Sequence, residues 1–234
     1  MKVIFIDIDN TLLSFDEYVK HTMKEGFAAF GLKPYEPWMF ETFTKVNNGL
    51  WQQIEQGTLT FQELVKIRWN RVFEALGIAF DGVVFEKHFR EALYESAIPE
   101  EGAYELLEHL HEKYLLCAAS NGPYQQQVHR LEIADMKKYF THLFVSEKIG
   151  ISKPATEFFD RAFQIVNEGE KEPVLPEECM MIGDSLTSDI KGGQMYGMKT
   201  CFYRRKKEVE VGTEVLVADT LEEVWECVCK AEGE

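Results

Sequence analysis

The chain has 234 residues, enough for one large domain or for a core domain with a smaller companion. Hydrophobic residues make up 45% and charged residues 28%, as in soluble globular proteins, and a net charge of −15 argues against a nucleic-acid polymer as partner. The one basic run, Arg204 to Lys207, is followed by Glu208 and Glu210, so we interpret it as a solvated loop.

Neither a membrane span nor a signal-peptide core is expected, because the apolar runs are too short. The five cysteines are odd in number and lack the spacing of a metal site. Cys117, Cys179 and Cys201 lie in or beside apolar runs, where a free thiol packs like a small hydrophobic side chain. Reduced cysteines of this kind predict a cytoplasmic protein.

The first predicted element is a buried strand over residues 2–7, a continuous apolar run that ends in an acid. Between residues 15 and 96, apolar residues recur at helical spacing instead, most clearly at 18–30, 60–76 and 85–94. Most of the 17 phenylalanines fall in this segment. We therefore predict a helical insertion with its own small core.

After this insertion, strands alternate with helices. The predicted strands are 114–120, 142–146, 179–184, 199–203 and 215–217. The predicted helices are 103–112, 124–131, 155–166, 188–196 and 221–230, with Gly197 ending the fourth. This alternation predicts an α/β fold: a Rossmann-like parallel sheet with helices on both faces, formed by 1–14 and 97–234, with 15–96 as a separate helical domain.

Two aspartates follow the first strand. Asp7 ends the strand and Asp9 comes two residues later, so on an extended segment their side chains point the same way. Carboxylates this close repel each other, and a divalent cation that prefers oxygen ligands would neutralise them. An aspartate pair after a strand can also simply close a turn, and the pair alone leaves both interpretations open.

Further polar residues follow later strands, at the edge where ligands bind in open α/β sheets. Ser120 and Asn121, before Gly122, offer hydroxyl and amide donors to an oxyanion, although they also suit an ordinary turn. Lys153 precedes Pro154, which suits the first position of the next helix. This places Lys153 at the mouth of the sheet, although a lone lysine is most often exposed to solvent.

A second acidic cluster follows the strand at 179–184. Gly183 permits a tight turn with Asp184 at its tip, and Asp189 follows near the start of a helix, where an acid is also favoured by the helix dipole. Together with the residues above, the cluster supplies the parts used in phosphoryl transfer. These are groups that offset phosphate charge, a nucleophile and an acid for the leaving group.

These residues occur in the order of the four motifs of the haloacid dehalogenase-like hydrolase superfamily, which the chain resembles from its first strand to about residue 203. The motifs are Asp7-Ile8-Asp9-Asn10-Thr11-Leu12, Ser120-Asn121, Lys153-Pro154, and Gly183-Asp184 through Asp189. The resemblance implies a Rossmann-like core with a helical cap inserted after the first motif, which is where residues 15–96 lie.

The resemblance also implies catalytic roles. Asp7 would attack phosphorus and form an aspartyl-phosphate, while Asp9 would protonate the leaving alkoxide and later activate water. True dehalogenases lack the second aspartate because a halide leaves without a proton, so Asp9 implies that the substrates are phosphate esters.

Ligand-binding roles are implied in the same way. Mg²⁺ would be held by the carboxylates of Asp7 and Asp184 and by the backbone carbonyl of Asp9, with Asp189 helping directly or through water. The residues implied to bind the phosphoryl oxygens are Ser120, Asn121 (through its backbone amide) and Lys153.

A second resemblance lies within the helical insertion. Val46-Asn47-Asn48-Gly49-Leu50-Trp51, followed by Gly57-Thr58-Leu59-Thr60, is similar to the cap of a bacterial subfamily of pyrimidine-nucleotide 5′-nucleotidases. The similarity implies that Trp51 stacks on a nucleobase, as aromatic side chains do in nucleotide-binding sites. In a segment so rich in aromatic residues, Trp51 is equally suited to the core of the cap.

We therefore predict a Mg²⁺-dependent phosphate monoester hydrolase that acts on a small phosphorylated metabolite, a nucleoside 5′-monophosphate. One alternative is a phosphosugar phosphatase or mutase of the same superfamily; the mutase would return the phosphoryl group to its substrate. A signalling receiver domain also combines acids, a hydroxyl residue and a lysine on a parallel sheet. However, its phospho-acceptor lies in a mid-chain strand, and it is shorter and has no helical insertion.

Overall fold

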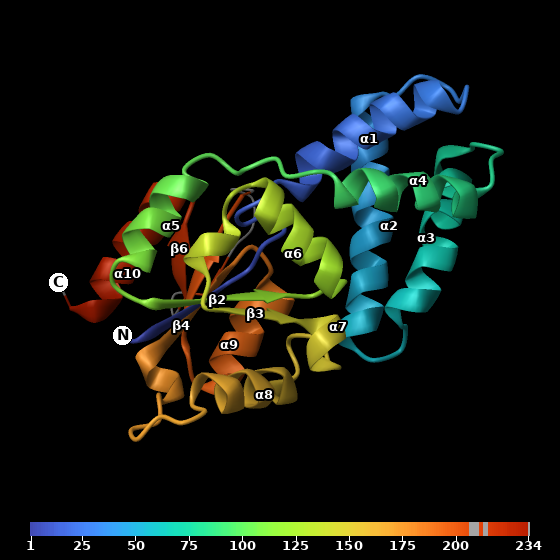
Figure 1. The fold of residues 1–234 in the computed structure, drawn as a ribbon. Helices are drawn as coiled ribbons and strands as arrows, with labels where there is room; N and C mark the ends of the chain where they lie inside the picture. Colours follow the sequence, from blue (N-terminus) through green and yellow to red (C-terminus); the bar gives the residue numbers. More distant parts are fainter. Residues whose placement is uncertain (206–210, 213–214, 234) are drawn as a thin grey trace. The chain divides into compact units, whose positions relative to one another are not determined.

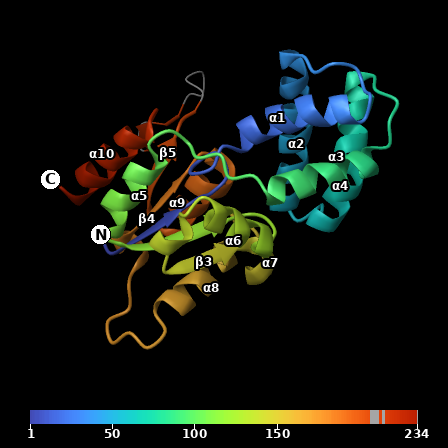
Figure 2. The same ribbon diagram turned by 45° about the horizontal axis from the view of Figure 1, so that its top comes forward.

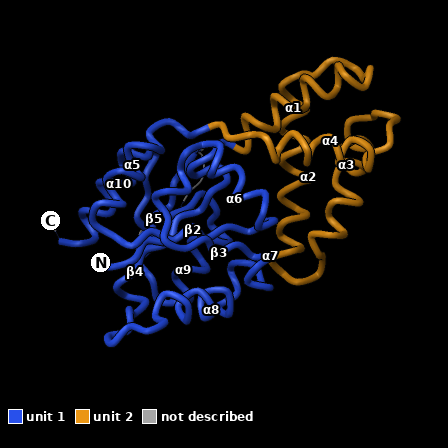
Figure 3. Tube along the Cα trace, in the orientation of Figure 1, with its two compact units in different colours: residues 1–14, 99–234 blue, residues 15–98 orange. Residues whose placement is uncertain are grey.

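The computed structural model describes residues 1–205, 211–212 and 215–233, which divide into two compact units (Figure 3). Unit 1 comprises Met1–Ser14 and Pro99–Glu234, and unit 2 is the inserted segment Phe15–Ile98. The second junction therefore lies slightly later than the 96/97 boundary taken from the sequence. Lys206 and Lys207 of the basic run expected to form a loop lie outside the described residues, as do Glu208 and Glu210, whereas Arg204 and Arg205 form ion pairs with Asp219 and Glu100.

Unit 1 is built on a parallel sheet, which in the described residues has six strands in the order β3-β2-β1-β4-β5-β6 (Figure 1). The strands are β1 (Val3–Ile6), β2 (Leu115–Ser120), β3 (His142–Val145), β4 (Cys179–Gly183), β5 (Lys199–Tyr203) and β6 (Leu216–Ala218). β1 pairs in parallel with β2 on one side and β4 on the other. The strand order reverses there, and ligands bind at such a switch point in open α/β sheets. The predicted fold class is confirmed.

Helices pack on both faces of this sheet (Figures 1 and 2). The helices of unit 1 are α5 (Ala103–His111), α6 (Tyr124–Ile133), α7 (Ser146–Ile149), α8 (Thr156–Val166), α9 (Lys191–Tyr196) and α10 (Leu221–Glu232). α8 and α9 lie on one face, and α5 and α10 pack together on the other. Phe5 of β1 packs against Phe159 and Phe163 of α8. All of β1 is buried, which explains why its sequence is continuously apolar.

Unit 2 has its own hydrophobic core. Its helices are α1 (Phe15–Ala29), α2 (Pro37–Glu55), α3 (Phe61–Leu76) and α4 (Gly82–Tyr94). The side chain of Trp69 is buried at the centre, with its ring centroid 4.4 Å from that of Phe85 and 5.2 Å from that of Phe43. α3 begins with a capping box between Thr60 and Glu63, and its bounds lie within one residue of the helix predicted over 60–76.

Local geometry differs from the sequence-based prediction in three places. Helix 188–196 is divided into a π-helical turn, Leu186–Ile190, and α9, which ends at Gly197 in the predicted left-handed conformation. The expectation that Pro154 begins a helix was wrong, because Ala155 has an extended backbone and α8 begins only at Thr156. The short helix α7 was not predicted.

Among the helices of the described residues, none is long and apolar enough to cross a membrane.

Candidate active site

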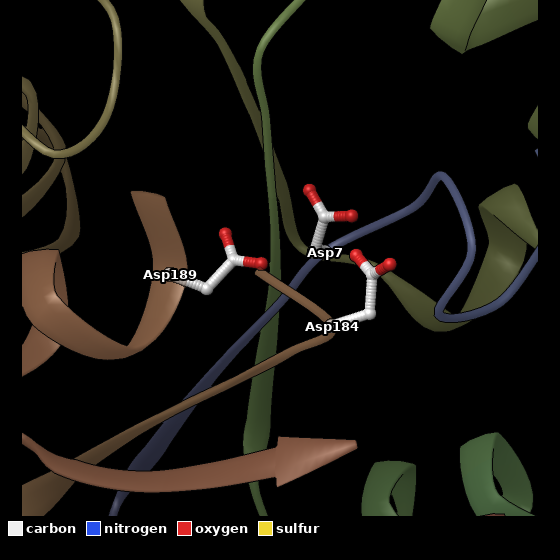
Figure 4. Close-up of side chains that lie close together, drawn as sticks. All are labelled: Asp7, Asp184 and Asp189. Atoms are coloured by element: carbon white, nitrogen blue, oxygen red, sulfur yellow. The ribbon is translucent and has the colours of Figure 1, made fainter. Parts of the chain in front are cut away.

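Three carboxylates converge at the centre of the sheet edge (Figure 4). Asp7 directly follows β1, and Asp184 directly follows the neighbouring strand β4. Asp189 comes from the π-helical turn, and each of the three offers a carboxylate oxygen within 4.8 Å of the others. A Cβ atom on Gly183 would lie only 2.2 Å from Oδ2 of Asp189, so this close approach requires glycine. Parallel neighbouring strands thus bring together the acids that the sequence separates widely.

Lys153 lies among these acids. It is 1% exposed, and its Nζ donates to Oδ1 of Asp7 at 2.8 Å, to Oδ1 of Asp189 at 2.6 Å and to the carbonyl of Ala119. These acceptors match the three N–H bonds of an ammonium group. Burial alone would lower the pKa of Lys153, but the carboxylates of Asp189 and Asp7 outweigh it and raise the pKa above its ordinary value. Lys153 is therefore charged and buried, not exposed as a lone lysine usually is.

The buried position of Asp7 disfavours its ionised form. Burial raises the pKa of Asp7 to about 7, with a further contribution from Asp189, although the Lys153 ammonium opposes the change. Asp7, Asp184 and Asp189 place three carboxyl groups within 4.8 Å of one another. Carboxylate oxygens are the ligands that Mg²⁺ prefers, so the donor set fits a divalent cation of this kind.

Asn121 stabilises the segment that carries Lys153. Its side-chain Nδ2 donates to the carbonyl of Lys153, and the backbone N–H of Lys153 donates to its Oδ1, both at 2.9 Å. This side-chain role was not anticipated from the sequence, which assigned Asn121 a backbone amide only. Ser120, which ends β2, is 1% exposed, and its Oγ accepts a hydrogen bond from Nε2 of Gln127 at 2.7 Å.

The carboxylate of Asp9 is engaged separately from the acidic cluster. Its Oδ1 accepts from Nη1 of Arg130 at 2.6 Å, and its Oδ2 accepts from Nε2 of Gln127 at 2.7 Å. The sequence analysis missed both partners, which lie three residues apart on one face of α6. The sequence carried no signal for them, because α6 has several other polar residues.

Trp51, the residue considered for nucleobase stacking, belongs to α2 of unit 2. It is partly buried, and its ring centroid lies 6.1 Å from that of Phe61 in α3. Its packing partner differs from those of Trp69, whose ring is fully buried among Phe43, Phe85 and neighbouring rings.

Comparison with known proteins gives consistent matches. Residues 1–197 match the family model of haloacid dehalogenase-like hydrolases. The chain is 32% identical over 203 residues to pyrimidine 5′-nucleotidase PynA from Streptococcus pneumoniae, which covers 86% of this chain and 83% of PynA. It is 28% identical to pyrimidine 5′-nucleotidase YjjG from Escherichia coli, over 97% of both chains.

A solved structure extends this similarity to three dimensions. The crystal structure of HAD-hydrolase YfnB from Bacillus subtilis, bound to magnesium, matches with a TM-score of 0.86 and 29% identity. The match covers 97% of this chain and 98% of YfnB. From the family-model match, the relatives and this fold, the chain belongs to the haloacid dehalogenase-like hydrolase family and is an enzyme of that family.

Proposed function

We propose that this hydrolase is a Mg²⁺-dependent phosphatase that cleaves phosphate monoesters through an aspartyl-phosphate on Asp7. The observation that carries the proposal is the convergence of Asp7, Asp184 and Asp189 around the buried ammonium of Lys153. The magnesium bound to YfnB supports a divalent cation in this protein. Unit 2 acts as the cap domain that encloses the substrate during transfer.

The carboxylates of Asp7 and Asp184 and the backbone carbonyl of Asp9 would hold Mg²⁺, with Asp189 acting directly or through water. When bound, Mg²⁺ offsets the negative charge of the phosphoryl group and helps to orient it. Lys153 fixes the orientation of the Asp7 carboxylate through the 2.8 Å hydrogen bond. Because its three N–H bonds already have acceptors, Lys153 exchanges one of them when it binds a phosphoryl oxygen.

The reaction has two displacements at phosphorus. In the first, a carboxylate oxygen of Asp7 forms a bond to phosphorus, the ester P–O bond breaks, and Asp9 gives its proton to the leaving alkoxide. In the second, Asp9 takes a proton from water, the resulting hydroxide attacks phosphorus, and the bond to Asp7 breaks. Ser120 and the backbone amide of Asn121 donate hydrogen bonds to the phosphoryl oxygens in both steps.

We further propose that the substrate is a nucleoside 5′-monophosphate with a pyrimidine base. The similarity to PynA and YjjG supports this choice, as does the segment that ends at Trp51. Trp51 would stack on the base, since base–aromatic stacking contributes about 1–3 kcal/mol per base in nucleotide-binding proteins.

The test is phosphate release from a panel of pyrimidine and purine nucleoside monophosphates and sugar phosphates, with Mg²⁺ or with a chelator. We expect Mg²⁺-dependent release that is fastest for the pyrimidine nucleotides. Preference for a sugar phosphate would replace the substrate assignment, and isomerised sugar phosphate among the products would indicate a mutase.

Asp7→Asn tests the nucleophile, because an amide cannot form the acyl phosphate. We expect Mg²⁺-dependent turnover to fall to background while the circular dichroism spectrum stays native. Turnover retained by this variant would show that Asp7 is not the nucleophile.

A further inference from the structure

Beyond the proposed residues of the reaction, two side chains of α6 contact the site. We propose that Arg130 is a positioning residue for Asp9, and that Gln127 positions both Asp9 and Ser120. The inference rests on the proposed function, since it assigns these two side chains to the proton-transfer and phosphate-binding groups of that reaction.

Arg130 and Gln127 together engage both oxygens of the Asp9 carboxylate. Nη1 of Arg130 lies 2.6 Å from Oδ1, and Nε2 of Gln127 lies 2.7 Å from Oδ2. A carboxylate held at both oxygens can neither rotate about its terminal bond nor tilt without breaking one of these contacts. The two donors thus determine where the acid lies relative to a leaving group.

The two donors are more deeply buried than the carboxylate that they hold. Arg130 and Gln127 are each 1% exposed, whereas the side chain of Asp9 is 29% exposed. A buried guanidinium surrounded by packed neighbours has a single orientation, and a charge-assisted hydrogen bond from it is stronger than a neutral one. The two buried donors on α6 therefore hold the more exposed Asp9 carboxylate in place.

The orientation of the Gln127 amide is determined by its neighbours. Nη1 of Arg130 also donates to Oε1 of Gln127 at 2.9 Å, so the amide oxygen faces the guanidinium and the amide nitrogen faces the Asp9 carboxylate. The opposite orientation would place two oxygens against each other and two donors against each other. Arg130 thus holds Gln127 as well as Asp9.

Gln127 extends this network to the phosphate-binding hydroxyl. Its Nε2 also donates to Oγ of Ser120 at 2.7 Å. A hydroxyl has one proton to donate, and because Oγ accepts from Gln127, this proton remains available for a phosphoryl oxygen. One glutamine thereby connects the group that protonates the leaving oxygen to a group that binds the phosphoryl oxygens.

The test of Arg130 compares two substrates with wild type, Arg130→Met and Asp9→Asn. A nucleoside monophosphate has an alkoxide leaving group that needs a proton, whereas p-nitrophenyl phosphate has one that does not. For Arg130→Met we expect kcat/KM, which reports the step in which the leaving group departs, to fall at least about tenfold more on the nucleotide than on p-nitrophenyl phosphate, since general acid catalysis contributes about 10²–10⁴-fold. The double variant Asp9→Asn/Arg130→Met should be no slower on the nucleotide than Asp9→Asn alone.

Gln127→Leu should give a different pattern. Because Ser120 loses its partner, kcat/KM should fall for both substrates, with a larger fall on the nucleotide. The matched control is Gln125→Leu, an exposed position on the same helix, which should leave kcat/KM unchanged on both substrates. Arg130→Lys should recover part of the lost kcat/KM, because an ammonium keeps the charge but not the planar donors.

The outcomes separate this inference from the proposed function. Equal loss on both substrates for Arg130→Met and Gln127→Leu, with a selective loss for Asp9→Asn, would overturn the positioning roles alone. Equal loss for Asp9→Asn itself would instead overturn the acid role on which they rest. If Arg130→Met does not fold, Arg130→Lys and Gln127→Leu carry the same comparison, with thermal denaturation as the check on folding.

Discussion

Asp184 differs from the other acids of the cluster in its exposure, because it is only partly buried whereas Asp7 and Asp189 are buried. It follows the strand next to β1, so its carboxylate can reach a cation without moving the sheet. In the proposed function, Asp184 binds the metal and takes no part in bond making or proton transfer.

Metal binding should therefore increase the stability of the folded protein as well as its activity. A ligand that binds only the folded state stabilises it by about 2.7 kcal/mol at 100 times its Kd. We expect Mg²⁺ to raise the midpoint of thermal unfolding of the wild type, and Asp184→Asn to remove most of this increase. An unchanged response to Mg²⁺ in Asp184→Asn would exclude Asp184 as a ligand.

The sequence-based placement of residues at one edge of the sheet depended on strand ends. Asp7, Ser120 and Asp184 follow parallel strands, so a sequence that predicts the strands also predicts one shared edge. Arg130 and Gln127 could not be found in this way. A polar residue on a helix carries no mark of the distant residue that it contacts, and the contact with Asp9 exists only once α6 has docked.

At the level of elements, unit 2 contains a buried ion pair between two helices. Arg68 of α3 donates to both carboxylate oxygens of Glu86 in α4, at 3.0 and 2.5 Å, and to Oδ1 of Asn47 in α2 at 3.1 Å. Arg68 and Glu86 are each 3% exposed. Burial raises the pKa of Glu86 even though the Arg68 guanidinium opposes the change, so the pair depends on both partners remaining charged.

Glu86→Gln should destabilise the protein strongly. The variant leaves the Arg68 guanidinium buried without a countercharge, which typically costs about 3–5 kcal/mol. The measurement is urea unfolding, with Glu91→Gln as the control on the same helix. Glu91 faces Lys87 at 3.9 Å in an exposed pair, so that variant should unfold close to the wild-type midpoint. Similar midpoints for the two variants would mean that the buried pair contributes little.

The ends of two helices show which boundaries a sequence pattern can predict and which it cannot. α3 was predicted almost to the residue from the helical spacing of its apolar side chains, and it begins with a capping box between Thr60 and Glu63. The π-helical turn Leu186–Ile190 was not distinguished from α9, because the apolar spacing of the two is continuous. What separates them is the position of Asp189 next to Gly183, and this is a tertiary contact.

In the whole molecule, two chain segments connect unit 1 to unit 2. These segments lie side by side where they leave unit 1. Leu13 forms an antiparallel bridge with Pro99, and the N–H of Glu100 donates to the carbonyl of Leu12 at 2.9 Å. The hydrophobic core around Phe5 and that around Trp69 share no residue. Each unit thus has the packing that an independently folding domain requires.

Replacement of residues 15–98 by a short Gly/Ser linker should leave a folded unit 1. Because the ends to be joined already lie together at the Leu13–Pro99 bridge, the linker closes a short gap at little entropic cost. We expect cooperative unfolding in urea and a native near-ultraviolet circular dichroism spectrum. Binding of a hydrophobic dye with loss of that spectrum would indicate a molten globule and contradict the prediction.

The central position of β1 also affects how the chain is made. Val3 pairs with Leu115 and Cys179, so the first strand to leave the ribosome has no partner until about a hundred residues later. At roughly 5–20 residues per second, this delay is about 5–20 s, long enough for the local helices of unit 2 to fold. During biosynthesis, the most apolar strand of the sheet is thus the one that stays unpaired longest, and chaperones that bind extended apolar segments should recognise it there.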